Sequence, residues 1–290
     1  MRNIAGKVVL ITGAARGIGA QTARELAGRG AKLALVGLEP EALAEVAAEL
    51  GEQHYWAEAD VTDPESIEAA VAGAVDALGG IDACVANAGI APVGTVREGD
   101  PRGFLKTIDV NVNGVFHTAR AVLPHLVDRR GHLLVVSSLS AFTPIGGMAA
   151  YTASKSAAES LASALRMEVL HLGVTVGSAH PSWVDTDLVR DVASDLETFT
   201  LMRKRLPWPM RSITTPEKCA KAFADGVEKR SRRVYVPRSI VLLHWLRNLN
   251  SSLLMEQALK PLLRKMIPKL EQEARELGRY MSERNQKINS

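Results

Sequence analysis

Short apolar runs alternate along this chain with longer segments in which apolar residues recur at helical spacing. The short runs are rich in β-branched residues and end at glycine or polar positions, which predicts buried strands. These strands are expected at Lys7–Thr12, Lys32–Val36, Tyr55–Ala59, Ala83–Ala86, Leu133–Ser137 and Thr175–Ala179. Helices are expected at Ile18–Gly30, Pro40–Leu50, Ser66–Leu78, near Phe104–Leu126 and at Ala149–Leu172.

Regular alternation of strands and helices requires right-handed crossovers between parallel strands. The pattern therefore predicts an α/β fold built on one doubly wound parallel sheet. Composition changes after about Val236, where Leu, Met, Trp and basic residues become frequent. We expect a catalytic and binding domain over 1–237 and a helical C-terminal extension over 238–290, of which the highly charged part from Lys269 onward is expected to be solvated.

Composition narrows the class of protein. The chain has 290 residues, 47% of them hydrophobic, and a formal net charge of only +3. No basic, aromatic-interleaved stripe indicates a nucleic-acid partner, and the histidines form no cluster with metal-ligand spacing. Only Cys84 and Cys219 are present, and the first residues do not resemble a signal peptide, so the cytoplasm is the expected location.

A glycine-rich turn follows the first predicted strand. The segment TGAARGIG contains Gly13, Arg16, Gly17, Ile18 and Gly19 between a strand and a helix. Glycines allow the backbone to turn sharply and to approach a pyrophosphate, whose charge lies at the helix N-terminus. The turn therefore predicts dinucleotide binding.

Further motifs follow in order along two-thirds of the chain. They are Asp60-Val61 after the third strand, Asn87-Ala88-Gly89 after the fourth, Asn111 in NVNGVF, Ser138 after VVS, YTASK with Tyr151 and Lys155, and PSWVDT with Pro181, Val184 and Thr186. Together with TGxxxGxG, this series resembles the classical short-chain dehydrogenase/reductase family. Two positions depart from the family pattern: Ala86 replaces an asparagine, and Ser182 replaces a glycine.

The resemblance implies a Rossmann-type fold, cofactor contacts from these motifs, and a catalytic set of Asn111, Ser138, Tyr151 and Lys155. It also implies that Asp60 holds the adenine ring, that Lys155 holds the nicotinamide ribose, and that Asn111 positions a water in a proton relay. A homodimer or homotetramer built on the long helices of Asn111 and Tyr151 is implied as well.

The residue types suit hydride-transfer chemistry. Tyr151 and Lys155 are four residues apart and share one helix face. We expect the ammonium to lower the pKa of the phenol, which could then exchange a proton with an alcohol or ketone oxygen. Ser138 could hydrogen-bond the same oxygen. The alternative is an exposed helix face that carries a tyrosine and a lysine without a role in catalysis.

The choice between NAD and NADP depends on the end of the second strand. An acidic residue there usually binds the adenosine ribose, but Gly37 takes that position, with Leu38 and Glu39 following. Arg16 could pair with a 2′-phosphate, whereas Glu39 would repel one. Because no second basic residue stands near Arg16, the sequence slightly favours NAD.

Two segments remain open to several interpretations. Residues 188–213 are expected to form a lid, and their apolar composition indicates either a pocket for a lipophilic substrate or simple packing. The extension carries an apolar stripe of Leu242, Leu243, Leu246, Leu249, Leu253 and Leu254 with basic flanks. It could pack on its own domain, border the substrate site, contact another subunit, or lie on a membrane as a peripheral contact.

The sequence therefore favours an NAD(P)-dependent oxidoreductase that interconverts a secondary alcohol and a ketone. One alternative is a non-catalytic dinucleotide-binding sensor or scaffold with the same fold. Another is an epimerase or dehydratase, although the long C-terminal substrate domain of such relatives is absent from the sequence.

Overall fold

A parallel sheet forms the centre of the molecule, seen in a computed structural model that describes residues 3–206, 208, 210–250, 252–279 and 281–284. Its seven strands have the order β3-β2-β1-β4-β5-β6-β9, and every neighbouring pair is parallel. They are β1 (Val8–Thr12), β2 (Lys32–Gly37), β3 (Tyr55–Glu58), β4 (Ala83–Ala86), β5 (His132–Val136), β6 (Thr175–Pro181) and β9 (Arg233–Val236). The expected doubly wound parallel sheet is confirmed.

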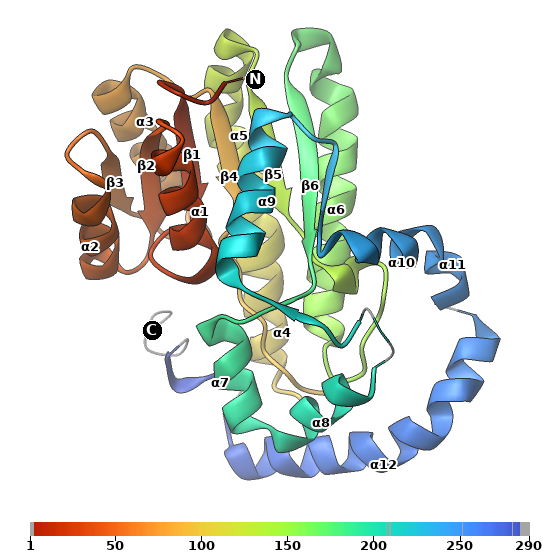
Figure 1. The fold of residues 1–290 in the computed structure, drawn as a ribbon. Coiled ribbons are helices and arrows are strands. Elements are labelled where there is room, and N and C mark those ends of the chain that lie inside the picture. Colours follow the sequence, from red (N-terminus) through yellow and green to blue (C-terminus); the bar gives the residue numbers. More distant parts are fainter. Residues whose placement is uncertain (1–2, 207, 209, 251, 280, 285–290) are drawn as a thin grey trace.

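Helices cover both faces of the sheet (Figure 1). One face carries α1 (Gly17–Gly28), α2 (Pro40–Leu50) and α9 (Pro216–Glu228), whose apolar residues pack with the strands around Leu26, Leu43 and Phe223. The other carries α3 (Pro64–Leu78), α5 (Gly114–Arg129) and α6 (Ala149–Val169). Burial on both faces explains why the strands read as continuous apolar runs.

Local sequence signals account for several element boundaries. The helix expected from Ser66 begins at Pro64, because the Asp63 side chain accepts a hydrogen bond from Glu65 N and caps it. The helix expected near 104–126 consists of α4 (Pro101–Ile108), a π-helical turn (Asp109–Asn113) and α5. Strand β9, at the edge of the sheet, is not among the predicted strands; its RVYV sequence alternates half-buried and buried residues instead of forming a continuous apolar run.

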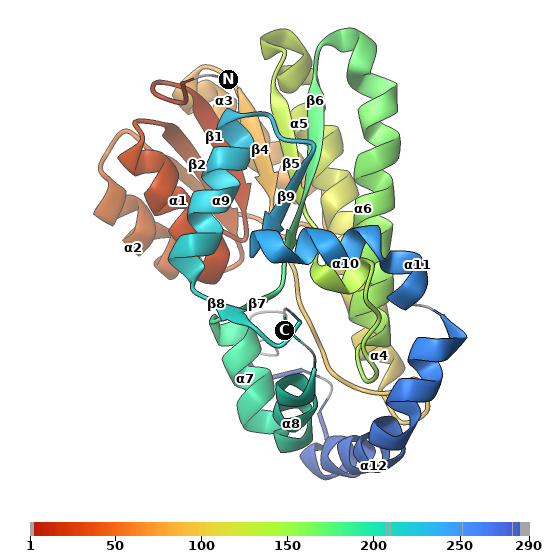
Figure 2. The same ribbon diagram turned by 45° about the vertical axis from the view of Figure 1, so that its right-hand side comes forward.

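The segment after β6 forms a separate layer below the sheet (Figure 2). It comprises β7 (Trp183–Val184), α7 (Asp187–Asp195), α8 (Glu197–Arg205) and β8 (Ile213–Thr214), and strands β7 and β8 pair with each other. Residues 207 and 209 of the expected lid lie outside the described residues. A third apolar core, around Trp183, Phe199 and Met202, joins this layer to the C-terminal extension.

The extension consists of a 3-10 turn (Arg238–Ile240), α10 (Val241–Trp245), α11 (Arg247–Asn250) and α12 (Leu253–Leu277). Helix α12 continues through Pro261 and Pro268 and passes beneath α8. Leu270 and Glu271 are buried, so the expectation of a solvated segment from Lys269 onward is wrong at these residues. No helix among the described residues has the length and apolar content needed to cross a membrane.

Candidate active site

The ends of β1 and β4 are joined by side-chain hydrogen bonds. The Thr12 hydroxyl accepts from Asn87 N at 3.0 Å and from Ala88 N at 3.2 Å. The Asn87 amide donates in return to the carbonyl oxygens of Thr12 at 3.0 Å and Gly13 at 3.2 Å. Two of the sequence motifs, the glycine turn and Asn87-Ala88-Gly89, therefore form one rigid unit at the carboxyl edge of the sheet.

Close backbone contacts explain the glycines of the turn. Gly13 has φ +65°, and a Cβ there would lie 2.9 Å from Ala88 Cα. A Cβ on Gly19 would lie only 2.0 Å from the Gly13 carbonyl oxygen. The N-cap residue of α1, Arg16, makes no capping hydrogen bond through its side chain, so the backbone N–H groups of the first turn are suited to an anion. This local geometry fits a pyrophosphate.

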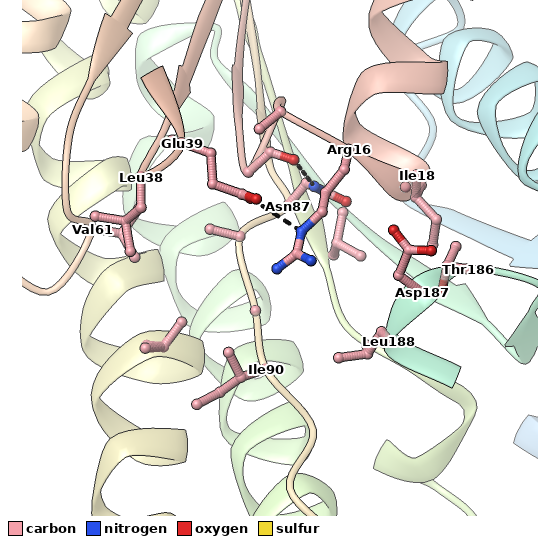
Figure 3. Close-up of a pocket in the computed structure, with 18 of the residues that line it drawn as sticks. Arg16, Ile18, Leu38, Glu39, Val61, Asn87, Ile90, Thr186, Asp187 and Leu188 are labelled. Atoms are coloured by element: carbon pink, nitrogen blue, oxygen red, sulfur yellow. Dashed lines mark hydrogen bonds and ion pairs between the residues drawn. The ribbon is translucent and has the colours of Figure 1, made fainter. Parts of the chain in front are cut away.

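A long cleft opens above this turn (Figure 3). Most of the cofactor contacts expected from the sequence border it: Gly13, Arg16, Gly17, Ile18, Leu38, Glu39, Asp60, Val61, Asn87, Ala88, Gly89, Tyr151, Lys155, Pro181 and Thr186. Gly19 and Val184 are not among the residues that border it. Gly19 supports the turn, and Val184 borders a neighbouring pocket.

One end of the cleft is shaped by charged side chains. Arg16 Nε lies 3.0 Å from Glu39 Oε2, and Figure 3 shows this ion pair spanning the cleft edge. Asp60 Oδ1 accepts from both the backbone N and the hydroxyl of Thr62, each at 2.8 Å. The two cues that conflicted in the sequence, Arg16 and Glu39, thus neutralise each other.

An apolar pocket adjoins the other end of the cleft. It is bordered by Ala91, Leu139, Ile145, Met148, Trp183, Val184, Val189, Val192 and Phe199, among others, and by Ser138, Ser140 and Ser182. The cleft and the pocket share Ile18, Tyr151, Pro181, Thr186 and Leu188. Tyr151 is the ionisable group common to both spaces.

Tyr151 and Ser138 are directly linked. A side-chain hydrogen bond joins them, and it acts to lower the pKa of the phenol. Burial has the larger effect, so the pKa of Tyr151 is raised from its ordinary value. The expected lowering by Lys155 is therefore wrong in this structure, where the Lys155 ammonium lies 5.7 Å from the ring centroid of Tyr151.

Lys155 borders the cleft and is held by hydrogen bonds at the end of β5. Its Nζ donates to the Val136 carbonyl at 2.9 Å, and the Ser137 hydroxyl donates to the Lys155 carbonyl at 2.8 Å. Burial lowers the pKa of Lys155 to about 8. Two bonds to the end of β5 thus fix the helix that carries both Tyr151 and Lys155.

Asn111 lies behind the cleft, in the π-helical turn. Its Oδ1 accepts from Ile90 N at 2.9 Å, and its Nδ2 donates to Ile90 O and to Ser154 Oγ, both at 2.9 Å. The side chain is fully buried. Asn111 therefore holds the loop after β4 against α6, while its part in a proton relay stays a prediction.

Sequence reasoning missed a polar group behind Ser138. The buried His180 has Nδ1 3.3 Å from the Ser138 carbonyl and Nε2 3.0 Å from Ser178 Oγ. A carbonyl can only accept, so His180 Nδ1 carries the proton and Nε2 accepts from the Ser178 hydroxyl. Burial lowers the pKa of His180 to about 4, which keeps the ring neutral. In the sequence, His180 is a single histidine before Pro181, and nothing near it indicates these hydrogen bonds.

The C-terminal extension holds the lid over the apolar pocket. The Glu273 carboxylate accepts from Thr198 N at 3.0 and 3.2 Å and from Thr198 Oγ1 at 2.5 Å, at the start of α8. Arg279 Nη2 lies 2.6 Å from Asp195 Oδ1 at the end of α7. The extension thereby holds both lid helices: α12 contacts the start of α8 through Glu273, and Arg279, just after α12, contacts the end of α7.

Several cleft residues were not expected from the sequence: Ala15, Ala59, Ile90, Val110, Val136, Ser137 and Asp187. Each adjoins a recognised motif or follows a strand end. The ends of the predicted strands could have indicated these residues, because the carboxyl ends of parallel strands meet at one edge of the sheet.

Comparisons with known proteins agree with this geometry. The profile of the family described as short chain dehydrogenase matches residues 7–197. A 3-alpha-(or 20-beta)-hydroxysteroid dehydrogenase of Mycobacterium bovis is 35% identical over 203 residues, covering 70% of this chain and 78% of that protein. A putative oxidoreductase SadH of Mycobacterium tuberculosis is 34% identical over 247 residues, covering 81% and 88%.

Among solved structures, a 3-ketoacyl-(acyl-carrier-protein) reductase from Brucella melitensis, complexed with NADH, superposes with a TM-score of 0.73 at 28% identity. The match covers 81% of this chain and 98% of that one. Fold, motif order and sequence similarity thus agree over the cleft and its catalytic edge. The chain belongs to the classical short-chain dehydrogenase/reductase family of oxidoreductases.

Proposed function

We propose that this protein interconverts a secondary alcohol and a ketone by hydride transfer with a nicotinamide dinucleotide. The observation that carries the proposal is the position of Tyr151, which borders both the long cleft and the apolar pocket. A dinucleotide in the cleft and a substrate in the pocket would meet at this side chain. A protein that only bound the dinucleotide would not need a proton donor at that junction.

The chain's own residues would control the proton and the geometry. A bound nicotinamide ring supplies the hydride acceptor or donor. Because burial raises the pKa of Tyr151, the phenol is protonated near neutral pH and suited to donate to a ketone oxygen. The Ser138 hydroxyl, already linked to the phenol, would hydrogen-bond the same oxygen and orient it.

Lys155 and Asn111 would support this pair. Lys155 lies in the cleft beside Tyr151 with a pKa of about 8, so a small change of environment would move it between charged and neutral forms. Its contact with the nicotinamide ribose is part of the proposal. Asn111 would act as a positioning residue for the loop around Ile90, which borders the cleft.

We infer a preference for NAD over NADP. A 2′-phosphate near Arg16 would have to displace or approach the Glu39 carboxylate, which lies 3.0 Å from the guanidinium. Ribose hydroxyls, in contrast, can donate to that carboxylate. The NADH in the Brucella melitensis structure is consistent with this inference.

We infer that the substrate is lipophilic. The pocket is bordered mainly by aliphatic and aromatic side chains, including Met148, Trp183 and Phe199. The hydroxysteroid dehydrogenase relative supports the same class of alcohol or ketone. In this proposal residues 1–237 bind and react, residues 188–213 cover the pocket, and residues 238–290 hold that cover in place.

The proposal is tested in two steps on the purified protein. Thermal unfolding is measured with NAD, NADH, NADP or NADPH, since a ligand that binds the native state raises the midpoint. The preferred dinucleotide is then followed by its absorbance with steroid, retinoid-like and aliphatic ketones and alcohols. We expect NADH to raise the midpoint most and a lipophilic ketone to oxidise it. Binding without turnover on any of them would favour the non-catalytic scaffold.

A homodimer or homotetramer built on the long helices is also proposed. Large apolar residues are exposed on α4, α5 and α6, including Leu105 at 66%, Phe116 at 48% and Met167 at 70%. Sedimentation of the wild-type protein and of Phe116→Glu tests this proposal. We expect dissociation of the variant into smaller species, and an unchanged mass would count against this surface.

A further inference from the structure

An exposed apolar surface lies on α10, α11 and the start of α12. It comprises Val241, Leu242, Trp245, Leu246, Leu249 and Leu253, which we call the C-terminal apolar surface. Trp245 is 80% exposed and Leu253 is 68% exposed. Figure 1 shows α10 and α11 at the right-hand edge of the molecule, away from the lid helices α7 and α8. Six exposed large side chains within thirteen positions exceed the scattered exposure of an ordinary surface.

Positive charge accompanies this surface. Segment 238–269 contains Arg238, Arg247, Lys260, Arg264, Lys265 and Lys269 but only one acidic residue, Glu256. All six basic side chains are exposed. Within the described part of the chain, no ion pair involves any of them, although Glu271 and Arg275, further along α12, are paired. The segment therefore combines leucine, tryptophan and unpaired cations.

We propose that this surface docks the protein onto an anionic lipid bilayer. Tryptophan and leucine enter the boundary between headgroups and acyl chains, while arginine and lysine pair with anionic headgroups. The mode of binding is peripheral, because no described helix can span a membrane. This docking goes beyond the proposed redox function and does not depend on it.

Charge decides between a bilayer and a second copy of the chain. A two-fold symmetric contact would bring two copies of this segment together, and each copy offers only Glu256 to pair with the cations of the other. An anionic bilayer instead complements them. The exposed leucines could contact either a bilayer or a second copy of the chain. The excess of positive charge favours the anionic bilayer.

The buried residues of the extension are consistent with docking through α10, α11 and the start of α12. On α12, Met266 and Leu270 are buried against the lid layer, so this part of the helix anchors the extension to the body. Its beginning, with Leu253, together with α10 and α11, is left exposed. The side chain of Leu254, part of the stripe expected from the sequence, lies outside the described residues.

The test uses the full-length protein with vesicles of phosphatidylglycerol and phosphatidylcholine, and with vesicles of phosphatidylcholine alone. We expect sedimentation with the anionic vesicles and not with the neutral ones, and release at high salt. Brominated lipids should quench the fluorescence of Trp245, and Trp245→Phe should remove that quenching. Equal binding to both vesicles, or to neither, would overturn the proposal.

Two variants separate the contributions. Arg264→Glu with Lys265→Glu should weaken vesicle binding at least tenfold, since each basic residue contributes roughly fivefold near an anionic surface. Lys32→Glu, an exposed lysine on β2, is the charge control and should bind almost as well as wild type. Trp245→Ser should also weaken binding, whereas Trp208→Ser, 66% exposed outside this surface, should not.

Measurements of turnover and of oligomeric state distinguish lipid docking from the redox proposal and from a contact between copies. Dinucleotide turnover in vesicle-free buffer should be the same for wild type, Trp245→Ser and Arg264→Glu with Lys265→Glu, so failure of the redox proposal and failure of docking are distinguishable. If Trp245→Ser instead lowered the sedimenting mass in solution, the surface would be a contact between copies, and lipid docking would be wrong.

Discussion

The dinucleotide cleft and the substrate lid are built in opposite ways. At the cleft, the side chains of Thr12 and Asn87 bond main-chain groups of the neighbouring strand end, and an added Cβ at Gly19 would lie 2.0 Å from the Gly13 carbonyl oxygen. At the lid, α7 has no buried residue, and it is paired with Arg279 and Arg284, which follow α12. The cleft is fixed by close backbone packing and by hydrogen bonds to backbone groups, and the lid by side chains of the C-terminal extension.

This difference distinguishes dinucleotide binding, which depends on the fold, from substrate choice, which depends on the lid. A cleft determined by backbone contacts tolerates little variation, so its motifs can be read directly from one sequence. A lid held by a few exchangeable ion pairs and caps can change shape without disturbing the sheet. We infer that dinucleotide binding belongs to the fold, while substrate choice belongs to the lid and the extension that holds it.

The largest effect is expected at the glycine turn. Gly19→Ala would place a Cβ 2.0 Å from the Gly13 carbonyl, which should lower the free energy of unfolding by about 3 kcal/mol and abolish dinucleotide binding. Gly28→Ala, in the same helix with nothing within 4 Å of its Cβ, is the matched control. It should be neutral or stabilising. Urea unfolding and a dinucleotide titration measure both, and equal behaviour would contradict the close-packed cleft.

Acid should destabilise the fold through two buried histidines, His132 on β5 and His180 on β6. Burial lowers the pKa of His132 to about 3 and that of His180 to about 4, so the unfolded chain binds more protons than the native one below pH 6.5. Stability is full above that pH and is lost as pH falls toward 4, by ~3 kcal/mol for His180 alone. Urea midpoints across this range measure the slope. In His132→Leu the slope should be shallower, and an unchanged slope would rule out this source.

The lid should respond to its contact with α12. Glu273→Ala removes the carboxylate that caps α8 at Thr198, at a cost of about 1 kcal/mol of stability. KM for the substrate should rise more than kcat falls, because the lid is displaced while Tyr151 is not. Glu276→Ala, exposed on the same helix, serves as the control. A fall in kcat alone, with KM unchanged, would argue against a lid function for α12.

The smallest effect is expected at the cleft edge. Glu39→Gln removes the carboxylate that pairs with Arg16 and repels phosphate. NADP should then bind about threefold to tenfold better relative to NAD, since the pair is partly exposed and its energy is modest. Dissociation constants for both dinucleotides measure the ratio. A ratio that stays at the wild-type value would show that this pair does not discriminate between them.

The parallel sheet and most of the cleft could be predicted because their causes are local. Apolar runs, helical spacing and the glycine turn each reflect backbone requirements within a few residues, as at Gly19, whose Cβ would meet the Gly13 carbonyl oxygen. The order of motifs then located Ser138, Tyr151 and Lys155, and the structure brings these three together at one edge.

The remaining features depend on contacts between distant residues. His180 and Ser138 are 42 positions apart, and Glu273 and Thr198 are 75 apart, so neither pair leaves a periodic signal. The raised pKa of Tyr151 was missed for a similar reason, because burial by the whole fold outweighs a neighbour four residues away. Tertiary burial, unlike spacing, cannot be read from the sequence.

The central claim is that Tyr151 transfers the proton at the junction of the cleft and the apolar pocket. The most direct measurement compares turnover and dinucleotide affinity in wild type and Tyr151→Phe. We predict that kcat falls about 10²–10⁴-fold, while the dissociation constant of the dinucleotide is unchanged. Turnover close to wild type in Tyr151→Phe would contradict this account.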